Sequence, residues 1–511
     1  MTPCLFGIEN ELGLVSGSNG TVRPAPAEMA SAIINDVGEH HVHVPSPPPE
    51  RRLFLANGAC VYTDIGGHPE IATAECCDPI DLAAQTIALR RMLAESADTV
   101  SRVYGVTVRL IANNLDYALG GAKTFGNHLN VFCSDLPFDR AATQLTPLLV
   151  AMPVVAGSGR VSFAAGSAGF ELSQRAGFMA TAVGKHTTDS RGMITRKDES
   201  LADHGIRIHV ISLDTVVSSW QLALVPSILA LSLKAIGTGE DIAGPVALLD
   251  PVESLRTVSC DPSLGARLPL KSGGTATALD ILDHYRRAVA DMIDHSDAPG
   301  WASKMVEMWA DVTGNLRTDW SLEFGRIDWV TKLVRLSQQL ERMGFGWQEF
   351  SRWTYTLGSV RRLKATFPEL DLRAVGGPAG LRRSALGTLE EHFVKQGLSW
   401  TKFPGIWEAA SLLCQQCLRY HFLDPARNLS HADAHPGLVP AERVDALRAA
   451  PPQGTRASVR GEAIRTAPPG ATAGWTFVDH GSRRLVMGDP FGAGASWHTT
   501  EPKTMGQESR T

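Results

Sequence analysis

The stretch L-F-G-I-E-N-E-L-G-L-V, residues 5–15, combines an apolar, strand-like run with two carboxylates placed two residues apart. In an extended strand alternate side chains point to opposite faces, so Glu9 and Glu11 share one face while Ile8 and Leu12 share the other. Two carboxylates about 7 Å apart on one face repel each other, and burying them without a partner is costly. The pattern therefore predicts a strand with one apolar face and one acidic face that requires a positive partner.

A second acidic stretch, V-Y-T-D-I-G-G-H-P-E-I-A-T-A-E-C, follows at residues 61–76. Tyr62 and Asp64 share a strand face, a pair of glycines turns the chain, and Glu70 and Glu75 come next. With the two glutamates of the first stretch this makes five carboxylates in two short segments. Such hard oxygen donors suit Mg²⁺, which binds carboxylates, waters and substrate phosphates. Solvated surface carboxylates are the alternative, but the clustering around Gly-rich turns favours a metal site.

The composition excludes some classes of protein. The chain has 511 residues, of which 44% are hydrophobic and 20% charged, as in soluble globular proteins. Its net charge of −5 provides no positive field for nucleic acid or an anionic membrane. The amino terminus lacks the basic and apolar regions of a signal peptide, and the most apolar run, residues 222–233, is too short to span a bilayer. Eight cysteines do not suggest a disulfide scaffold, so a cytoplasmic location is expected.

The hydrophobic periodicity predicts the order of the elements. Helices are expected at residues 25–36, 79–103 and over most of 215–420. Strands are expected at residues 1–15, 52–56, 59–64, 106–114, 128–133 and 205–213. The Pro-rich stretch at residues 40–52 is expected to form a connection without ladder pairing, and residues 365–385 a loop.

These elements predict an α+β fold, with a largely antiparallel sheet and helices on one side. The length requires more than one compact unit. We expect a large domain at residues 1–435, a small carboxy-terminal domain at 436–495, and a disordered tail at 496–511.

Six segments carry a resemblance to a known family: GIENE, NGACVYTDIGGHPEIATAEC, GFELSQR, RIHVI, TRASVRGE and GDPF. They occur in the same order from residue 7 to about residue 491, and the second is long and specific. The chain resembles the family of the Pup ligase and the Pup deamidase/depupylase, relatives of glutamine synthetase and γ-glutamylcysteine synthetase. The resemblance implies a glutamine-synthetase-like cradle of antiparallel sheet with a small carboxy-terminal domain.

The resemblance also implies a reaction, with ATP and Mg²⁺ as cofactors. The ligase of the family transfers the ATP γ-phosphate to the terminal glutamate side chain of the small modifier protein Pup. A lysine amine of a target protein then displaces the phosphate and leaves an isopeptide bond. The depupylase carries out hydrolysis in a similar cradle. A Pup-like modifier and lysine-bearing proteins are therefore the implied partners.

The resemblance assigns roles to residues of this chain. The implied metal ligands are Glu9, Tyr62 and Glu70, with Glu11 and His128 as further candidates. The implied nucleotide contacts are Thr73 and Trp475, together with the arginines Arg191, Arg207, Arg456 and Arg460, for which structural salt bridges are the alternative. Asp64 falls on the catalytic carboxylate, a general base whose surroundings would have to raise its pKa.

Three positions depart from the family pattern. Cys60 stands where the family has an ATP-binding arginine, Leu129 replaces the carboxylate of a His-Glu-Asn motif, and Leu201 replaces a histidine. Because of these changes, three alternatives remain for the chain. It could be a divergent paralogue that acts on another carboxylate, a small-molecule amide ligase, or a non-catalytic protein.

Two features bear on the choice between ligase and hydrolase. The depupylase has an insertion where this chain has only the short connection at residues 38–52, which favours the ligase. The segments GFELSQR and SCDPSL look closer to the depupylase. A ligase is the preferred interpretation.

A zinc site is a competing interpretation of Cys414, Cys417, His431 and His435, because their spacing is close to that of a two-Cys, two-His finger. The cysteines lie in a segment that reads as an amphipathic helix, which favours core packing instead.

Overall fold

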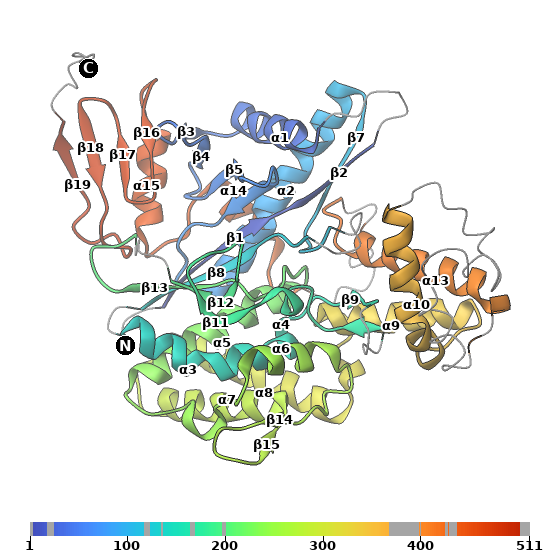
Figure 1. The fold of residues 1–511 in the computed structure, drawn as a ribbon. Coiled ribbons are helices and arrows are strands. Elements are labelled where there is room, and N and C mark those ends of the chain that lie inside the picture. The colour runs from blue at the N-terminus through green and yellow to red at the C-terminus, as the bar shows by residue number, and fades with distance from the viewer. Residues whose placement is uncertain are drawn as a thin grey trace, which may run out of the picture.

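The structure is a computed structural model (Figure 1). It describes residues 4–17, 25–116, 123–133, 136–163, 169–196, 201–366, 398, 400–424, 428 and 437–500.

A nine-stranded sheet forms the centre of the protein, in the order β11-β12-β13-β8-β1-β6-β5-β4-β3. Its strands are β1 Leu5–Glu11, β3 His43–Pro45, β4 Arg52–Leu55, β5 Cys60–Thr63, β6 Pro69–Ala72, β8 Asn127–Cys133, β11 Thr181–Gly184, β12 Gly192–Thr195 and β13 Ile206–Val210. All neighbours pair antiparallel except β11 and β12. The prediction of a largely antiparallel sheet is confirmed.

The expected loop at residues 40–52 is partly wrong, because His43–Pro45 forms β3. Among the described strands β3 pairs with β4 alone and forms the edge of the sheet, where a proline can lie without removing a ladder hydrogen bond.

Alternation along the strands gives the sheet two different faces. One face carries Ile8 of β1, Ile71 of β6 and Leu129 of β8, all buried in apolar clusters with the helices. The other carries Glu9 and its same-face neighbours described below. The period of two that is visible in residues 5–15 therefore extends across the central strands.

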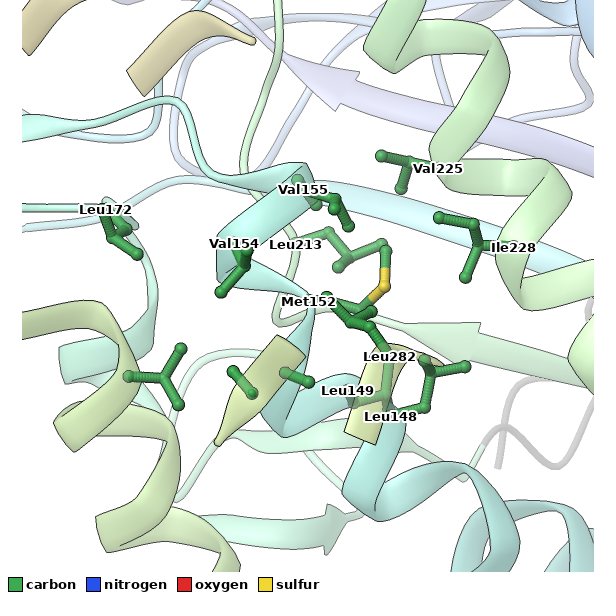
Figure 2. Packing of buried hydrophobic residues seen from close by; sticks show 14 of the residues in the cluster. Leu148, Leu149, Met152, Val154, Val155, Leu172, Leu213, Val225, Ile228 and Leu282 are labelled. Carbon is green, nitrogen blue, oxygen red and sulfur yellow. The ribbon is translucent and has the colours of Figure 1, made fainter. Parts of the chain in front are cut away.

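Helices cover the apolar face (Figure 1). The helices of the described residues are α1 Pro26–His40, α2 Pro79–Tyr104, α3 Phe138–Ala151, α4 Pro153–Ala156, α5 Ser219–Gly237, α6 Pro251–Cys260, α7 Ala278–Asp294, α8 Ala302–Thr318, α9 Asp328–Arg342, α10 Trp347–Thr366, α13 Phe403–Tyr420, α14 Ala441–Ala449 and α15 Arg456–Arg465. Of these, α1, α2, α3 and α5 contact the main sheet on its apolar face, whereas α15 packs on β3 and β4 with the carboxy-terminal unit. Short 3-10 segments are η2 Ala176–Phe178, η3 Gly244–Val246, η4 Trp320–Glu323 and η5 Trp400–Lys402. Figure 2 shows the main core, where Leu148 and Met152 at the end of α3 pack near Val225 and Ile228 of α5.

Helix α5 is long and apolar enough to cross a membrane by length and composition. The conclusion from residues 222–233 that this apolar segment is too short to span a bilayer was therefore wrong. However, 83% of its most apolar window is buried inside the protein. It is the helix that packs beneath β8 and β1 and against α2, α7 and α8. Burial against these elements accounts for its apolar composition.

Smaller sheets complete the described fold. They pair β2 Gly13–Gly17 with β7 Thr107–Ile111, β9 Arg160–Val161 with β10 Phe170–Glu171, and β14 Leu268–Pro269 with β15 Thr275–Ala276. The remaining sheet consists of β16 Thr472–Ala473, β17 Phe477–Asp479, β18 Arg483–Val486 and β19 Ser496–Thr499.

The carboxy-terminal unit consists of α15 and the β16–β19 sheet, which lie over the β3–β4 end of the main sheet (Figure 1). Helix α14 packs instead on α2, through Val444 and Leu447. Because residues 496–499 form β19, a disordered tail that begins at residue 496 is wrong. The division at residue 436 stays a prediction.

Candidate active site

The predicted metal ligands converge on the polar face of the main sheet. Tyr62 and Glu70 are Cα partners in neighbouring strands, and Glu70 is also the partner of Glu11. Glu9 is the partner of Ala72 and of His128, one row further along the same face. Side chains opposite each other or diagonal across adjacent strands are within reach of one another, so register alone brings this set together.

Glu70 is buried, with 5% of its surface exposed, and it lies next to other carboxylates. Burial and the negative charges of Glu9 and Glu11 hold the pKa of Glu70 well above its usual range. Burial, with the charges of Glu70 and Glu9, likewise raises the pKa of Tyr62. A cation among these oxygens would remove the repulsion, and the donor set of carboxylates and a phenol fits a hard divalent ion such as Mg²⁺.

On its other side Glu9 has an imidazole, an amide donor and an arginine as neighbours. His128 Nδ1 lies 3.3 Å from its carboxylate, Asn130 Nδ2 donates to it at 3.1 Å, and Arg207 Nη1 is 3.6 Å away. Although burial opposes ionisation, the hydrogen bond with His128 and the charge of His209 hold the pKa of Glu9 below its usual range. Ligand atoms of Glu9, His128 and His209 lie within 4.8 Å of one another. Sequence reasoning missed His209, although it alternates with Arg207 on the same strand.

Asp64 is held by the turn that follows β5. Its carboxylate accepts the backbone N–H of His68 at 2.6 Å, and His68 Nδ1 lies 3.3 Å from its second oxygen. Gly67 completes the turn at a φ of 83° and donates its N–H to the Asp64 carbonyl. The imidazole of His68 stacks on Phe125 and lies 4.0 Å from the Glu11 carboxylate. Sequence reasoning missed His68 as a partner of Asp64.

The expectation that the surroundings raise the pKa of Asp64 is wrong. Burial acts in that direction, but the hydrogen bonds from His68 outweigh it and lower the pKa of Asp64. The carboxylate is therefore ionised at neutral pH, which suits it to attract an ammonium group before accepting a proton from it.

A cavity of about 100 Å³ opens beside Glu9, between the main sheet and the carboxy-terminal unit. Its polar wall includes Thr73, Arg207 and Arg456, and Trp475 closes one side. Leu5, Phe6, Ile8, Ala72, Phe132, Leu201, Ala202 and Pro490 also border the cavity, although the side chain of Ile8 lies on the opposite face of the sheet. Thr73 Oγ1 accepts the N–H of Ile8 at 2.9 Å. A hydroxyl can also donate, and among the described residues no acceptor takes the hydroxyl hydrogen of Thr73. A flat aromatic wall next to cations and carboxylates fits a nucleotide better than a purely apolar ligand.

The arginine predictions have different outcomes. Arg207 and Arg456 line the cavity, whereas Arg460 is fully buried and bound to Glu75. The alternative of a structural salt bridge is thus confirmed for Arg460, and Arg456 combines such a bridge with a place in the cavity wall. Arg191 is not part of the cavity lining, and its Nε donates to the Thr187 carbonyl at 2.8 Å.

The three residues that differ from the family pattern lie in different surroundings. Cys60 is fully buried between Phe54 and Ala72, and burial raises the pKa of its thiol far above the usual range. Leu129 points to the apolar face, away from the site. Leu201 lines the cavity.

Arg52, which sequence reasoning missed, lies near the position of the absent arginine. Its guanidinium lies over the Tyr62 ring, 4.7 Å from the ring centre. The charges that act on it include those of Tyr62 and Glu70, so a cation remains at this edge of the carboxylate cluster.

The zinc interpretation is tested only in part. Cys414 and Cys417 lie on α13 and are buried, as expected for core residues. His431 and His435 lie outside the described residues.

Comparison with known proteins places this geometry in a family. Residues 5–360 match the family model described as Pup-ligase protein. The chain belongs to the Pup-ligase family. A Pup deamidase/depupylase of Mycolicibacterium smegmatis is 36% identical over 303 residues, covering 58% of this chain and 60% of the relative. A Pup–protein ligase of Acidimicrobium ferrooxidans is 32% identical over 338 residues, covering 65% and 72%.

Solved structures of this family have the same fold. The complex between Pup and its ligase PafA matches with a TM-score of 0.73 at 21% identity, over 96% of this chain and 89% of that one. PafA in complex with ADP matches with a TM-score of 0.66 at 22% identity, over 93% of both chains. The expected fold is confirmed.

Proposed function

We propose that this chain is an ATP- and Mg²⁺-dependent carboxylate–amine ligase, which joins the terminal glutamate side chain of a Pup-like modifier to a lysine amine of a target protein. The observation that carries the proposal is the convergence of Glu9, Tyr62 and Glu70 on one face, between Asp64 and the cavity. Family membership and the named Pup–protein ligases among the relatives support it.

Mg²⁺ would be held by Glu9, Tyr62 and Glu70, with Glu11 and His128 alongside, and the repulsion at Glu70 is the observation that supports the fit. When bound, the ion supplies positive charge that offsets the charge of the nucleotide phosphates. The nucleotide would occupy the cavity between Thr73 and Trp475.

The described residues then support two steps. In the first, Arg207 and Arg456 hold phosphate oxygens while an oxygen of the modifier glutamate attacks the γ-phosphorus and the bond to ADP breaks. In the second, the lysine nitrogen attacks the acyl carbon, the C–N bond forms, and inorganic phosphate leaves. Asp64 attracts the lysine ammonium and takes its proton, and His68 holds the Asp64 carboxylate in place.

Hydrolysis of an isopeptide or amide bond is the second candidate. It is favoured by the 36% identity to a depupylase, which exceeds the 32% identity to the ligases. The short connection at residues 41–51, which contains β3, favours the ligase. In a hydrolase Asp64 would serve as nucleophile or activate water.

One set of incubations separates these functions. The chain is mixed with Mg²⁺, ATP, Pup and a lysine-bearing protein, and in parallel with a preformed Pup conjugate. We expect a new conjugate and stoichiometric ADP in the first mixture, and an unchanged conjugate in the second. Cleavage of the conjugate without net ATP consumption would favour the hydrolase. The absence of ATP turnover with any carboxylate, together with an intact conjugate, would exclude both. A cytoplasmic location stays a prediction.

A further inference from the structure

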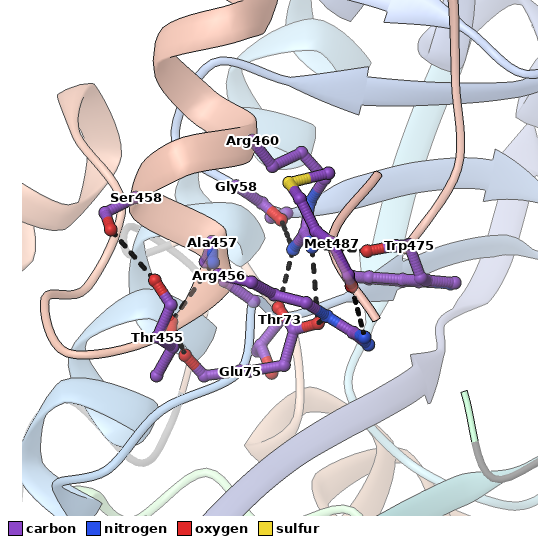
Figure 3. A network of polar contacts seen from close by, with 12 residues as sticks. Gly58, Thr73, Glu75, Thr455, Arg456, Ala457, Ser458, Arg460, Trp475 and Met487 are labelled. Carbon is purple, nitrogen blue, oxygen red and sulfur yellow. Dashed lines mark hydrogen bonds and ion pairs between the residues drawn. The ribbon is translucent and has the colours of Figure 1, made fainter. Parts of the chain in front are cut away.

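Glu75 lies two residues after Thr73 and receives two arginines from the carboxy-terminal unit (Figure 3). Arg456 Nε donates to its Oε1 at 2.7 Å. Arg460 donates to Oε1 at 3.2 Å and to Oε2 at 2.6 Å. More than 380 positions separate the partners in the chain, so these contacts join α15 to the segment that follows β6.

Both guanidinium groups are out of solvent: Arg460 is 0% exposed and Arg456 is 3% exposed. Buried arginines need a counter-charge and hydrogen-bond acceptors, since an unpaired buried charge is strongly destabilising. Glu75 meets that need. Burial opposes its ionisation, but the charges of Arg460 and Arg456 lower the pKa of Glu75 to about 2, so the carboxylate stays charged at neutral pH.

Arg460 extends from Glu75 to one wall of the cavity. Its Nη1 donates to the Trp475 carbonyl at 2.9 Å, and its guanidinium lies 4.9 Å from the centre of the Trp475 ring. Its Nη2 donates to the carbonyl of Gly58, in the turn between β4 and β5. The orientation of Trp475 over the cavity therefore depends on an arginine that Glu75 holds.

Arg456 extends from Glu75 to another wall. Its Nη1 donates to the Leu201 carbonyl at 2.6 Å and to the Met487 carbonyl at 3.2 Å. Close by, Asp203 N donates to the carbonyl of Gly488 at 3.1 Å. The segment that carries Leu201, which lines the cavity, is thus joined to the carboxy-terminal unit.

The backbone of Glu75 contributes a further contact. Thr455 Oγ1 donates to the Glu75 carbonyl at 3.0 Å and accepts the N–H of Ala457, which caps the first turn of α15. Side chain and backbone of one residue therefore fix both the start of α15 and two of its arginines.

We propose that Glu75 is a positioning residue that docks α15 and so sets the nucleotide affinity of the site. The proposal rests on the proposed function, because it assumes that the cavity binds the nucleotide. Glu75 does not line the metal cluster. Glu75 itself borders the cavity, and through Arg456 and Arg460 it also holds the walls that carry Leu201 and Trp475.

This role makes a different prediction from simple stabilisation. Loss of stability lowers the folded fraction, so the apparent kcat falls while the KM of the remaining folded enzyme is unchanged. Loss of positioning weakens ATP binding in folded enzyme, so the KM for ATP rises while kcat at saturating ATP is largely kept.

The test compares Glu75→Gln with a matched control, Glu462→Gln. Glu462 lies on α15 as well, but it is exposed, and among the described residues its side chain pairs with Arg465 on the helix surface. At a temperature where circular dichroism shows all proteins folded, we expect the KM and Kd for ATP of E75Q to rise about tenfold or more, with kcat within about threefold of wild type. The control should match wild type in both. An unchanged KM in folded E75Q, or an equal rise in the control, would overturn the proposal.

Glu75→Gln leaves two buried arginines short of a charge, so a milder variant is needed if E75Q does not fold. Arg460→Lys keeps the ion pair with Glu75 but loses the fork that reaches both Trp475 and Gly58. We expect folded R460K to raise the KM for ATP about threefold with kcat unchanged, and an unchanged KM would overturn the proposal. Absence of ATP binding by the wild-type chain would overturn the proposed function as well, whereas equal binding by wild type and variants would overturn only the role of Glu75.

Discussion

His128 and Leu129 are consecutive in β8, yet their side chains lie on opposite faces of the nine-stranded sheet. His128 contacts Glu9 in the site, whereas Leu129 is 2% exposed and packs with Ile8 and Leu213 in the main core. The loss of a carboxylate at position 129 is thus a change in the core. It gives no physical reason to regard the site as inactive.

Truncation of Leu129 tests this placement. We expect Leu129→Ala to lower the free energy of unfolding by about 2–4 kcal/mol, because it removes buried methyl groups and leaves a cavity. The KM for ATP should stay at the wild-type value. Urea unfolding and initial rates measure the two quantities, and a changed KM with unchanged stability would place Leu129 in the site instead.

Substitution of Asp64 separates chemistry from binding. Asp64→Asn keeps the shape and the hydrogen bond from the His68 N–H but removes the charge that attracts and deprotonates the lysine. We expect conjugate formation to fall by at least about 100-fold, with ATP affinity within about threefold of wild type. Asp445→Asn, at an exposed position on α14, is the control and should be fully active. Wild-type rates in D64N would remove Asp64 from the mechanism.

The polar face of the sheet could be predicted from the sequence because its cause is local. Alternation in residues 5–15 places Glu9 and Glu11 on one side, and the Asn57-Gly58 turn pairs β4 with β5. Only the period of two and a turn signal are needed for these conclusions. The family resemblance then assigned Tyr62 and Glu70 to the same site.

The contacts that could not be predicted are those made by tertiary packing. The pairing of Glu75 with Arg460 crosses 385 positions and has no local signal. Asp64 was expected to be a raised-pKa base, because the backbone turn that brings the His68 N–H onto it is not visible as a pattern. The strand β3 was missed because prolines usually exclude pairing, and only its place at the sheet edge permits it.

Arg52 provides a test of how the site functions without an arginine at position 60. Its guanidinium lies over Tyr62 beside the carboxylate cluster, so it can offset phosphate charge there. We expect Arg52→Met to raise the KM for ATP about fivefold to tenfold, in steady-state assays of ADP release. The neighbouring Arg51 is exposed, and Arg51→Met is the control. Equal effects of the two variants would show that only general charge matters.

Neutralisation of Glu70 should improve stability while it removes activity. Because its pKa is raised in the folded state, Glu70 contributes stability at low pH that is lost as the pH rises and the group ionises. In EDTA at pH 7.5, Glu70→Gln should therefore raise the free energy of unfolding by about 1–2 kcal/mol. Its Mg²⁺-dependent ATP turnover should fall by at least about 100-fold. A variant that is less stable than wild type without metal would contradict the charge repulsion on which the metal site rests.

The last prediction concerns Lys332, a buried cation in the core. Its Nζ donates to the Gly159 carbonyl at 2.8 Å and contacts His421. Burial lowers the pKa of Lys332 to about 8, against 10.5 for the unperturbed group. Between these values the unfolded chain binds more protons than the folded chain, so stability from this group increases as the pH rises. We expect wild type to gain about 2 kcal/mol relative to Lys332→Met between pH 8 and 10, measured by urea unfolding. Lys402→Met removes an exposed lysine and should leave this dependence intact. Parallel pH profiles of wild type and K332M would show that Lys332 titrates as it does in water.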